Sequence, residues 1–213
     1  MKNRERTDIH IGLSEMSVVD AAIEYIQEIF QDKSDGQGVD HTMRVYHNAL
    51  SIAGHYEESD LELVSLAALL HDVDDHKLFQ TENNANARNF LEKQGLNKDR
   101  TDIICDIINA VSFSKNKGRT PDTLEGKIVQ DADRIDAMGA IGIARTFAYG
   151  GKCGRDMDSS VEHFHDKLLL LKDMMNTDEA RKIAEDRHKY MEQFLSELEK
   201  ETNMHPDRNK NIE

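Results

Sequence analysis

The segment LAALLHDVDDHK, residues 66–77, places metal-binding side chains at the end of an apolar stretch. His71 and Asp72 directly follow five residues, 66–70, that are typical of a buried helix. Adjacent residues on a helix point about 100° apart, so these two side chains can share one ion only if it lies between them. The doublet therefore predicts one corner of a metal site, and further ligands must come from other helices.

Two other segments supply candidate ligands. His41 lies in VDHTMRVYHNAL, and both Asp131 and Asp133 lie in KIVQDADRID. The two aspartates are about 200° apart on a helix, so spacing alone leaves either one as the fourth ligand. Taken singly, a histidine near a helix start or an acidic helical stretch is more often an ordinary surface or core feature. The co-occurrence of His, His-Asp and Asp on three separate amphipathic segments favours a metal site.

This order of residues resembles the HD superfamily of metal-dependent phosphohydrolases, whose pattern is one His, then a His-Asp doublet, then a later Asp. The matching residues are His41 in HTMRV, His71 and Asp72 in LLHDV, and Asp133 in ADRID. The resemblance implies that these four residues ligate the metal. The AD context selects Asp133, and Asp131 is kept as a fallback.

A longer resemblance, over residues 20–198, is to the bacterial HD-domain subgroup similar to YpgQ and YedJ. It is carried by LEGKIVQDADRIDAMGAIGIARTFAYGG and HFHDKLLLLKDMMNTDEARKIAEDRHKYMEQFL. It implies manganese-dependent hydrolysis of nucleoside or deoxynucleoside triphosphates to a monophosphate and pyrophosphate. Two alternatives stay open: a phosphomonoesterase or phosphodiesterase acting on another nucleotide, of the cyclic-nucleotide or guanosine tetraphosphate type, and a noncatalytic nucleotide-sensing module.

The expected ligand set of two imidazoles and two carboxylates also limits the choice of metal. A mixed nitrogen and oxygen set without thiolate fits Mn²⁺, Fe²⁺, Co²⁺ or Ni²⁺ better than a closed structural zinc site, and among these the resemblance implies Mn²⁺. Mg²⁺ is less natural because it prefers oxygen ligands and retained water. Such an ion would polarise a phosphoryl oxygen and lower the pKa of a bound water.

A nucleotide substrate also needs basic partners. Arg44 lies three residues after His41 on the same helix face, and Lys77 lies just beyond the doublet. Asp75, four residues after His71, is a candidate general base or water-positioning residue. We expect the base and sugar in a shallow apolar cleft near residues 140–165. Weaker basic candidates are Lys127, Arg134 and Lys167.

Composition bounds the remaining possibilities. A net charge of −14 over 213 residues argues against broad binding to nucleic acid or anionic membranes. The two cysteines, Cys105 and Cys153, do not make a disulfide framework. The N-terminus lacks the apolar block of a secretory signal. We therefore expect a cytoplasmic protein acting on a small-molecule nucleotide, with the oligomeric state, a homodimer included, left open.

The hydrophobic pattern is helical nearly throughout. It predicts an all-α, single-domain helical bundle of about seven or eight helices over residues 17–201, with flexible tails at 1–16 and 202–213. One long helix is expected to begin near residue 124 and run to the glycines at 150–151. A loop is expected at 150–160. Gly139 and Gly142 are expected to let two helices approach closely rather than to form a phosphate loop.

Overall fold

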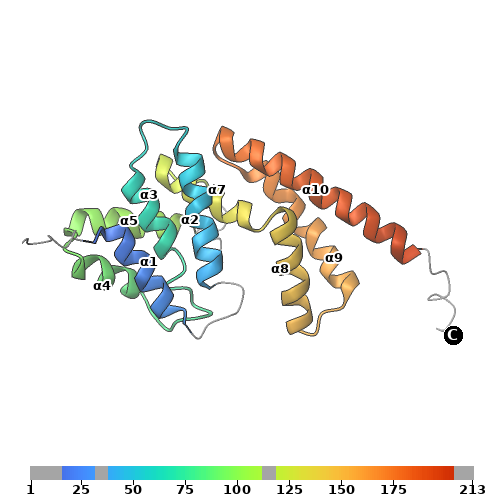
Figure 1. The fold of residues 1–213 in the computed structure, drawn as a ribbon, viewed down its shortest axis with the longest axis horizontal. Coiled ribbons are helices and arrows are strands. Elements are labelled where there is room, and N and C mark those ends of the chain that lie inside the picture. Colours follow the sequence, from blue (N-terminus) through green and yellow to red (C-terminus); the bar gives the residue numbers. More distant parts are fainter. Residues whose placement is uncertain (1–15, 32–37, 112–118, 204–213) are drawn as a thin grey trace, which may run out of the picture.

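The computed structural model describes residues 16–31, 38–111 and 119–203, and helix is the only regular secondary structure in these ranges (Figure 1). The predicted all-α class is confirmed. The α-helices are α1 (Val18–Ile29), α2 (Val39–Ala53), α3 (Leu61–Leu70), α4 (Ala85–Lys93), α5 (Lys98–Val111), α7 (Leu124–Asp136), α8 (Gly139–Lys152), α9 (Met157–Asp166) and α10 (Asp178–Asn203); the 3₁₀-helix η1 spans Leu168–Met174.

Helix α3 lies in the middle of the N-terminal bundle and carries the His-Asp doublet at its end. Every residue from Leu63 to Leu70 is buried, and the helix packs against α1, α2, α5 and α7. Its first turn is fixed by Asp60, whose side chain accepts hydrogen bonds from the backbone amides of Glu62 and Leu63, each at 3.0 Å. The buried helix is thus a rigid mount for the residues that follow it.

Helix α7 joins the two parts of the molecule. It packs against α2, α3 and α5 on one side and against α10 on the other, and Figure 1 shows it between the N-terminal bundle and the group formed by α8, α9 and α10. Asp131, fully buried, accepts hydrogen bonds from the backbone amides of Asn176 and Thr177 just before α10 begins. The carboxylate therefore fastens the start of α10 to α7.

The prediction of one long helix from residue 124 was wrong. The chain turns between Asp136 and Gly139, and Gly139 adopts a positive φ of 68°, a conformation that residues with a Cβ rarely take. A Cβ on Gly142 would lie 2.2 Å from the carbonyl oxygen of Ala137. The two glycines thus allow a sharp break rather than a continuous helix, and the described residues form nine α-helices instead of seven or eight.

The loop expected at 150–160 was also mostly wrong. Helix α8 continues to Lys152, and α9 already begins at Met157 after Asp156 caps its first turn. Gly150 permits this tight connection, since a Cβ there would lie 2.6 Å from the Ser160 hydroxyl. At the C-terminus α10 runs to Asn203, two residues past the predicted domain end. The predicted tails otherwise lie outside the described residues.

None of the helices in the described ranges combines the length and the apolar character that a membrane span requires.

The glycine break generates a stability prediction. Gly142→Ala should lower the free energy of unfolding by about 1–3 kcal/mol, because the new methyl group meets a backbone oxygen that cannot move independently. Gly151→Ala is the matched control on the same helix, since a Cβ there has open space around it. It should be neutral or stabilising by about 0.5 kcal/mol. Urea unfolding of both variants gives the comparison, and equal stability of the two would contradict the packing at the break.

Candidate metal centre

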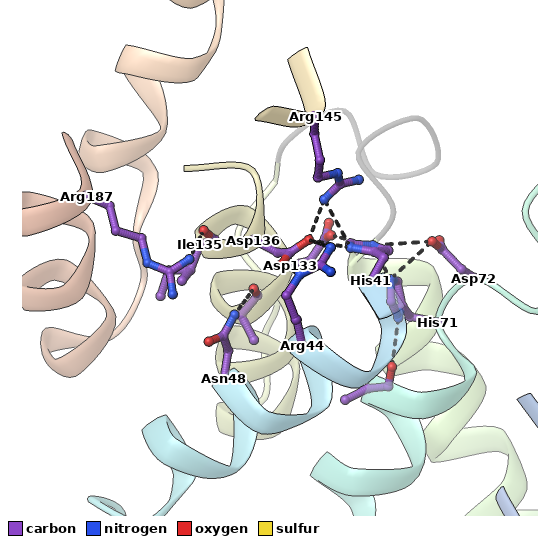
Figure 2. A network of polar contacts seen from close by, with 12 residues as sticks. His41, Arg44, Asn48, His71, Asp72, Asp133, Ile135, Asp136, Arg145 and Arg187 are labelled. Atoms are coloured by element: carbon purple, nitrogen blue, oxygen red, sulfur yellow. Dashed lines mark hydrogen bonds and ion pairs between the residues drawn. The ribbon is translucent and has the colours of Figure 1, made fainter. Parts of the chain in front are cut away.

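Three helices bring candidate ligands to one point (Figure 2). His41 comes from the first turn of α2, His71 from the C-terminal end of α3, and Asp133 from the second half of α7. One ligand atom from each of these residues lies within 4.8 Å of the others. The Nε2 atoms of the two histidines are 3.4 Å apart, and Asp133 Oδ1 is 3.4 Å from His41 Nε2.

Hydrogen bonds on the far side of each imidazole decide which nitrogen faces this point. His71 Nδ1 donates to the carbonyl oxygen of Ala68 at 2.8 Å, and His41 Nδ1 donates to Asp136 at 2.7 Å. Arg145 Nη1 also lies 3.2 Å from His41 Nδ1, but the nearer and charged acceptor Asp136 favours a proton on that nitrogen. Each neutral ring therefore carries its proton on Nδ1, so both Nε2 atoms present lone pairs to the same space. This is how protein structures commonly orient a metal-ligating histidine.

Asp72 completes the cluster. Its Oδ2 atom lies 3.5 Å from His41 Nε2 and 3.4 Å from His71 Nε2. The same oxygen is buried and has no hydrogen-bond partner among the described residues. A buried polar atom without a partner is costly, and here it lies beside the Nε2 atoms of both histidines. The arrangement calls for a cation.

A divalent ion fits this arrangement. Ligand atoms at about 2.1 Å from an ion lie roughly 3.0–3.4 Å from one another in octahedral or tetrahedral geometry, close to the separations above. The charge balance agrees. Burial opposes protonation of His71, yet the adjacent carboxylates of Asp72 and Asp133 outweigh it and raise the histidine's pKa. The carboxylates therefore favour positive charge at this point, against the effect of burial.

The sequence reasoning missed Asp136. This residue at the end of α7 is 1% exposed and accepts hydrogen bonds from three side chains: His41, Arg44 and Arg145. Burial alone would raise the pKa of its carboxyl group, but the bonds from His41 and Arg44 and the charge of Arg145 hold that pKa well below its usual range. Its position three residues after Asp133, one helical turn away, was the available signal.

Two of the predicted residues have other partners. Asp131 lies on the opposite side of α7 and accepts from the start of α10, and burial raises its pKa. The structure thus gives the fallback ligand a structural role. Arg134 is buried and donates to the carbonyl oxygen of Met174, away from the cluster. Burial lowers its pKa.

Asp75 shapes the turn after the doublet. Its carboxylate accepts a hydrogen bond from the Lys77 backbone amide at 2.8 Å, and its carbonyl oxygen accepts from Leu78 and Phe79. The neighbouring Asp74, which is buried, accepts from the first amides of α4. The segment after α3 is thereby held in one conformation.

A cavity of about 680 Å³ lies beside the cluster, between this turn and helices α8 and α9. Arg145 belongs both to its lining and to the Asp136 network, so this side chain links the cavity to the residues around the metal centre. No carboxylate lines it within the described part of the chain. The predicted cleft was apolar, whereas several Lys and Arg side chains line this cavity. The lining residues are Lys77, Leu78, Ala137, Gly142, Arg145, Thr146, Ala148, Tyr149, Lys152, Arg155, His163, Lys167 and Leu168.

Only some of the predicted basic residues line the cavity. Lys77 and Lys167 line it, whereas Lys127 does not. Arg145, Lys152 and Arg155 were missed. Arg145 lies on the segment that was expected to continue α7 as one straight helix, and Lys152 and Arg155 lie in the segment that was expected to be a loop.

Comparison with known proteins agrees with this geometry. The family model of the HD domain matches residues 38–138, the span from α2 to the end of α7 that holds the whole cluster. The YpgQ protein of Bacillus subtilis (strain 168) is 44% identical over 186 residues, which cover 83% of this chain and 90% of YpgQ. The chain belongs to the HD superfamily, in its YpgQ-like subgroup. It is therefore a metal-dependent phosphohydrolase, and HD domains bind divalent metals.

Solved structures extend the likeness to the C-terminal helices. The structure of Bacillus subtilis YpgQ in complex with ADP matches with a TM-score of 0.73 and 39% identity, covering 86% of this chain and 97% of that one. An HD-superfamily hydrolase from Bacillus thuringiensis matches with a TM-score of 0.73 and 40% identity, covering 87% and 96%. The protein L803 of Acanthamoeba polyphaga mimivirus is 33% identical, over 63% of this chain and 74% of L803.

The different surroundings of the two aspartates on α7 give a metal-binding prediction. Asp133→Asn should weaken Mn²⁺ binding by at least about 10-fold, because it removes a charged ligand candidate from the cluster. Asp131→Asn should bind Mn²⁺ like the unaltered protein, since its carboxylate serves α10. Calorimetric titration of Mn²⁺ into both variants decides the matter, and the reverse order would move the ligand to Asp131.

Proposed function

We propose that the protein hydrolyses nucleoside or deoxynucleoside triphosphates to the monophosphate and pyrophosphate, with Mn²⁺ as the preferred ion. The observation that carries this proposal is the basic cavity whose lining includes Arg145, a side chain that donates to Asp136 beside the metal centre. A net charge of −14 makes a cavity lined by cations and by no described carboxylate a local reversal of the protein's field. The ADP complex of the related YpgQ supports a nucleotide as the occupant.

In this proposal His41, His71, Asp72 and Asp133 hold the ion. When bound, it would polarise a phosphoryl oxygen and supply hydroxide near neutral pH. Two imidazole nitrogens and two carboxylates suit Mn²⁺, Fe²⁺, Co²⁺ or Ni²⁺, and they suit Mg²⁺ less well because it prefers oxygen ligands and retained water. The buried, unpartnered Oδ2 of Asp72 supports this ligand set.

The basic residues of the cavity have a separate task. Metal ligation alone does not choose between the terminal bond and the α–β bond of a triphosphate. Charge placed where the leaving group departs does choose, because pyrophosphate carries more negative charge than orthophosphate and gains more from cations. Lys77, on the turn beyond the doublet, and Lys152, Arg155 and Lys167, on the α8–α9 side, supply that charge. We therefore assign attack to the α-phosphorus.

Other residues of the site complete the proposal. Leu78 and Leu168 offer the nucleoside apolar contact, and the ring of Tyr149 offers a face for stacking. Asp75 is the proposed general base or water-positioning residue, since its carboxylate keeps acceptor capacity beyond the one bond to the Lys77 amide. Arg44 reaches the phosphates, in this proposal, from its place beside Asp136.

Hydrolysis in ¹⁸O-labelled water tests the bond that is cut. Attack at the α-phosphorus should place the label in the nucleoside monophosphate and leave pyrophosphate unlabelled, as mass spectrometry of the products would show. Label in pyrophosphate would move the attack to the β-phosphorus. A diphosphate and orthophosphate as the primary products would refute pyrophosphohydrolysis and indicate a nucleoside triphosphatase that cleaves the terminal anhydride bond.

The role of the cavity's charge can be tested by a pair of lysine variants. Lys77→Ala should lower kcat/KM for a triphosphate by about 10–100-fold, which corresponds to the loss of one charge-assisted contact to the leaving group. Lys127→Ala is the control, because this lysine lies on α7 but does not line the cavity. Steady-state kinetics with Mn²⁺ gives both values. A loss of the same size in the two variants would indicate a general effect of net charge instead.

A further inference from the structure

Asp136 is the most heavily bonded carboxylate near the metal centre. Its Oδ2 accepts from His41 Nδ1 at 2.7 Å, from Arg44 Nη2 at 3.1 Å and from Arg145 Nη1, and its Oδ1 accepts from Arg44 Nε at 2.6 Å. Figure 2 shows this side chain between His41 and the two arginines. The three donors come from two helices, α2 and α8, while Asp136 ends α7.

We propose that Asp136 is a positioning residue that sets the tautomer of His41 and holds Arg44 and Arg145 between the metal centre and the cavity, so that one carboxylate couples metal binding to phosphate binding. The proposal rests on the metal-dependent nucleotide hydrolysis proposed above. It assigns to Asp136 no contact with substrate or ion.

The exposure of the three partners supports this role over that of a simple structural ion pair. Asp136 and His41 have side chains that are 1% and 4% exposed, whereas the side chains of Arg44 and Arg145 are 34% and 30% exposed. The carboxylate is thus buried, and the guanidinium groups it holds keep an open side. One negative and two positive charges leave a net positive charge beside the metal centre, and one of the two arginines, Arg145, also lines the cavity.

A carboxylate is required here because every group facing it is a donor. An amide at this position would have one oxygen and one NH₂ group. If its oxygen stayed towards His41, the NH₂ group would face the Arg44 Nε–H. If it flipped, the NH₂ group would face His41 Nδ1 and favour the tautomer with a proton on Nε2. That proton would occupy the lone pair that faces the metal centre. Either orientation breaks one part of the network.

The test uses the full chain with Asp136→Asn, and Asp131→Asn as its control. Both aspartates are buried on α7 and accept several hydrogen bonds, but only Asp136 faces the cluster. We expect Asp136→Asn to bind Mn²⁺ about 10–100-fold more weakly by calorimetry, and to raise KM for a triphosphate at saturating Mn²⁺. Asp131→Asn should lower the melting temperature without changing either constant. Mn²⁺ affinity like that of the unaltered protein in Asp136→Asn would overturn the proposal, as would equal losses in the two variants.

A second measurement does not depend on the variant folding. In the unaltered, metal-free protein, ¹⁵N chemical shifts of the imidazoles should show His41 with its proton on Nδ1, and a proton on Nε2 would overturn the proposal. These readouts separate it from the proposed function. If the protein binds Mn²⁺ and Asp136→Asn weakens that binding, the inference holds even when no triphosphate is cleaved.

Discussion

The contact between α2 and α7 is the constraint on which the metal centre depends. Asp136 and Asp133 are one turn apart on α7, and His41 lies against both, bonded to the first at 2.7 Å and 3.4 Å from the second. Asn48, two turns further along α2, donates to the Ala132 carbonyl oxygen and keeps the helices in this register. A shift of α2 by one residue would turn His41 away from the doublet on α3, and a shift of α7 by one residue would turn Asp133 and Asp136 away from His41.

A strongly acidic protein can hold an anionic substrate only if its charges are segregated. The carboxylates of the metal centre are collected at one end of the site, where an ion would balance them. The cations belong to the turn after α3 and to the α8–α9 connection, on the other side of Arg145. Arg145 lies at the boundary and is bonded to Asp136. The two regions are therefore linked by a hydrogen-bonded ion pair rather than only by proximity.

The candidate metal ligands and most of the cavity's basic residues lie in different parts of the chain. The matched HD domain ends at residue 138, directly after α7, and contains the candidate metal ligands. Most of the cavity's basic residues come from the helices beyond it. Two contacts hold these helices to the domain. Asp131 of α7 accepts a hydrogen bond from the backbone amide of Thr177, just before α10, and Arg187 of α10 donates to the carbonyl oxygen of Ile135. Buried polar contacts of α7 thus help to fix the position of the helices that form the α8–α9 side of the cavity.

The sequence by itself determined the all-α class, the family and the three segments that carry candidate ligands, because apolar periodicity and the His, His-Asp, Asp order are local patterns. The tertiary structure decided what spacing could not. It separated Asp131 from Asp133, because Asp131 accepts hydrogen bonds from the start of α10. It brought Asp136 together with three partners that lie 9 to 95 residues away in the chain. It also broke the expected long helix at Gly139. Helical propensity is additive along a segment, whereas a backbone turn at a positive φ and the convergence of distant side chains depend on packing against other helices.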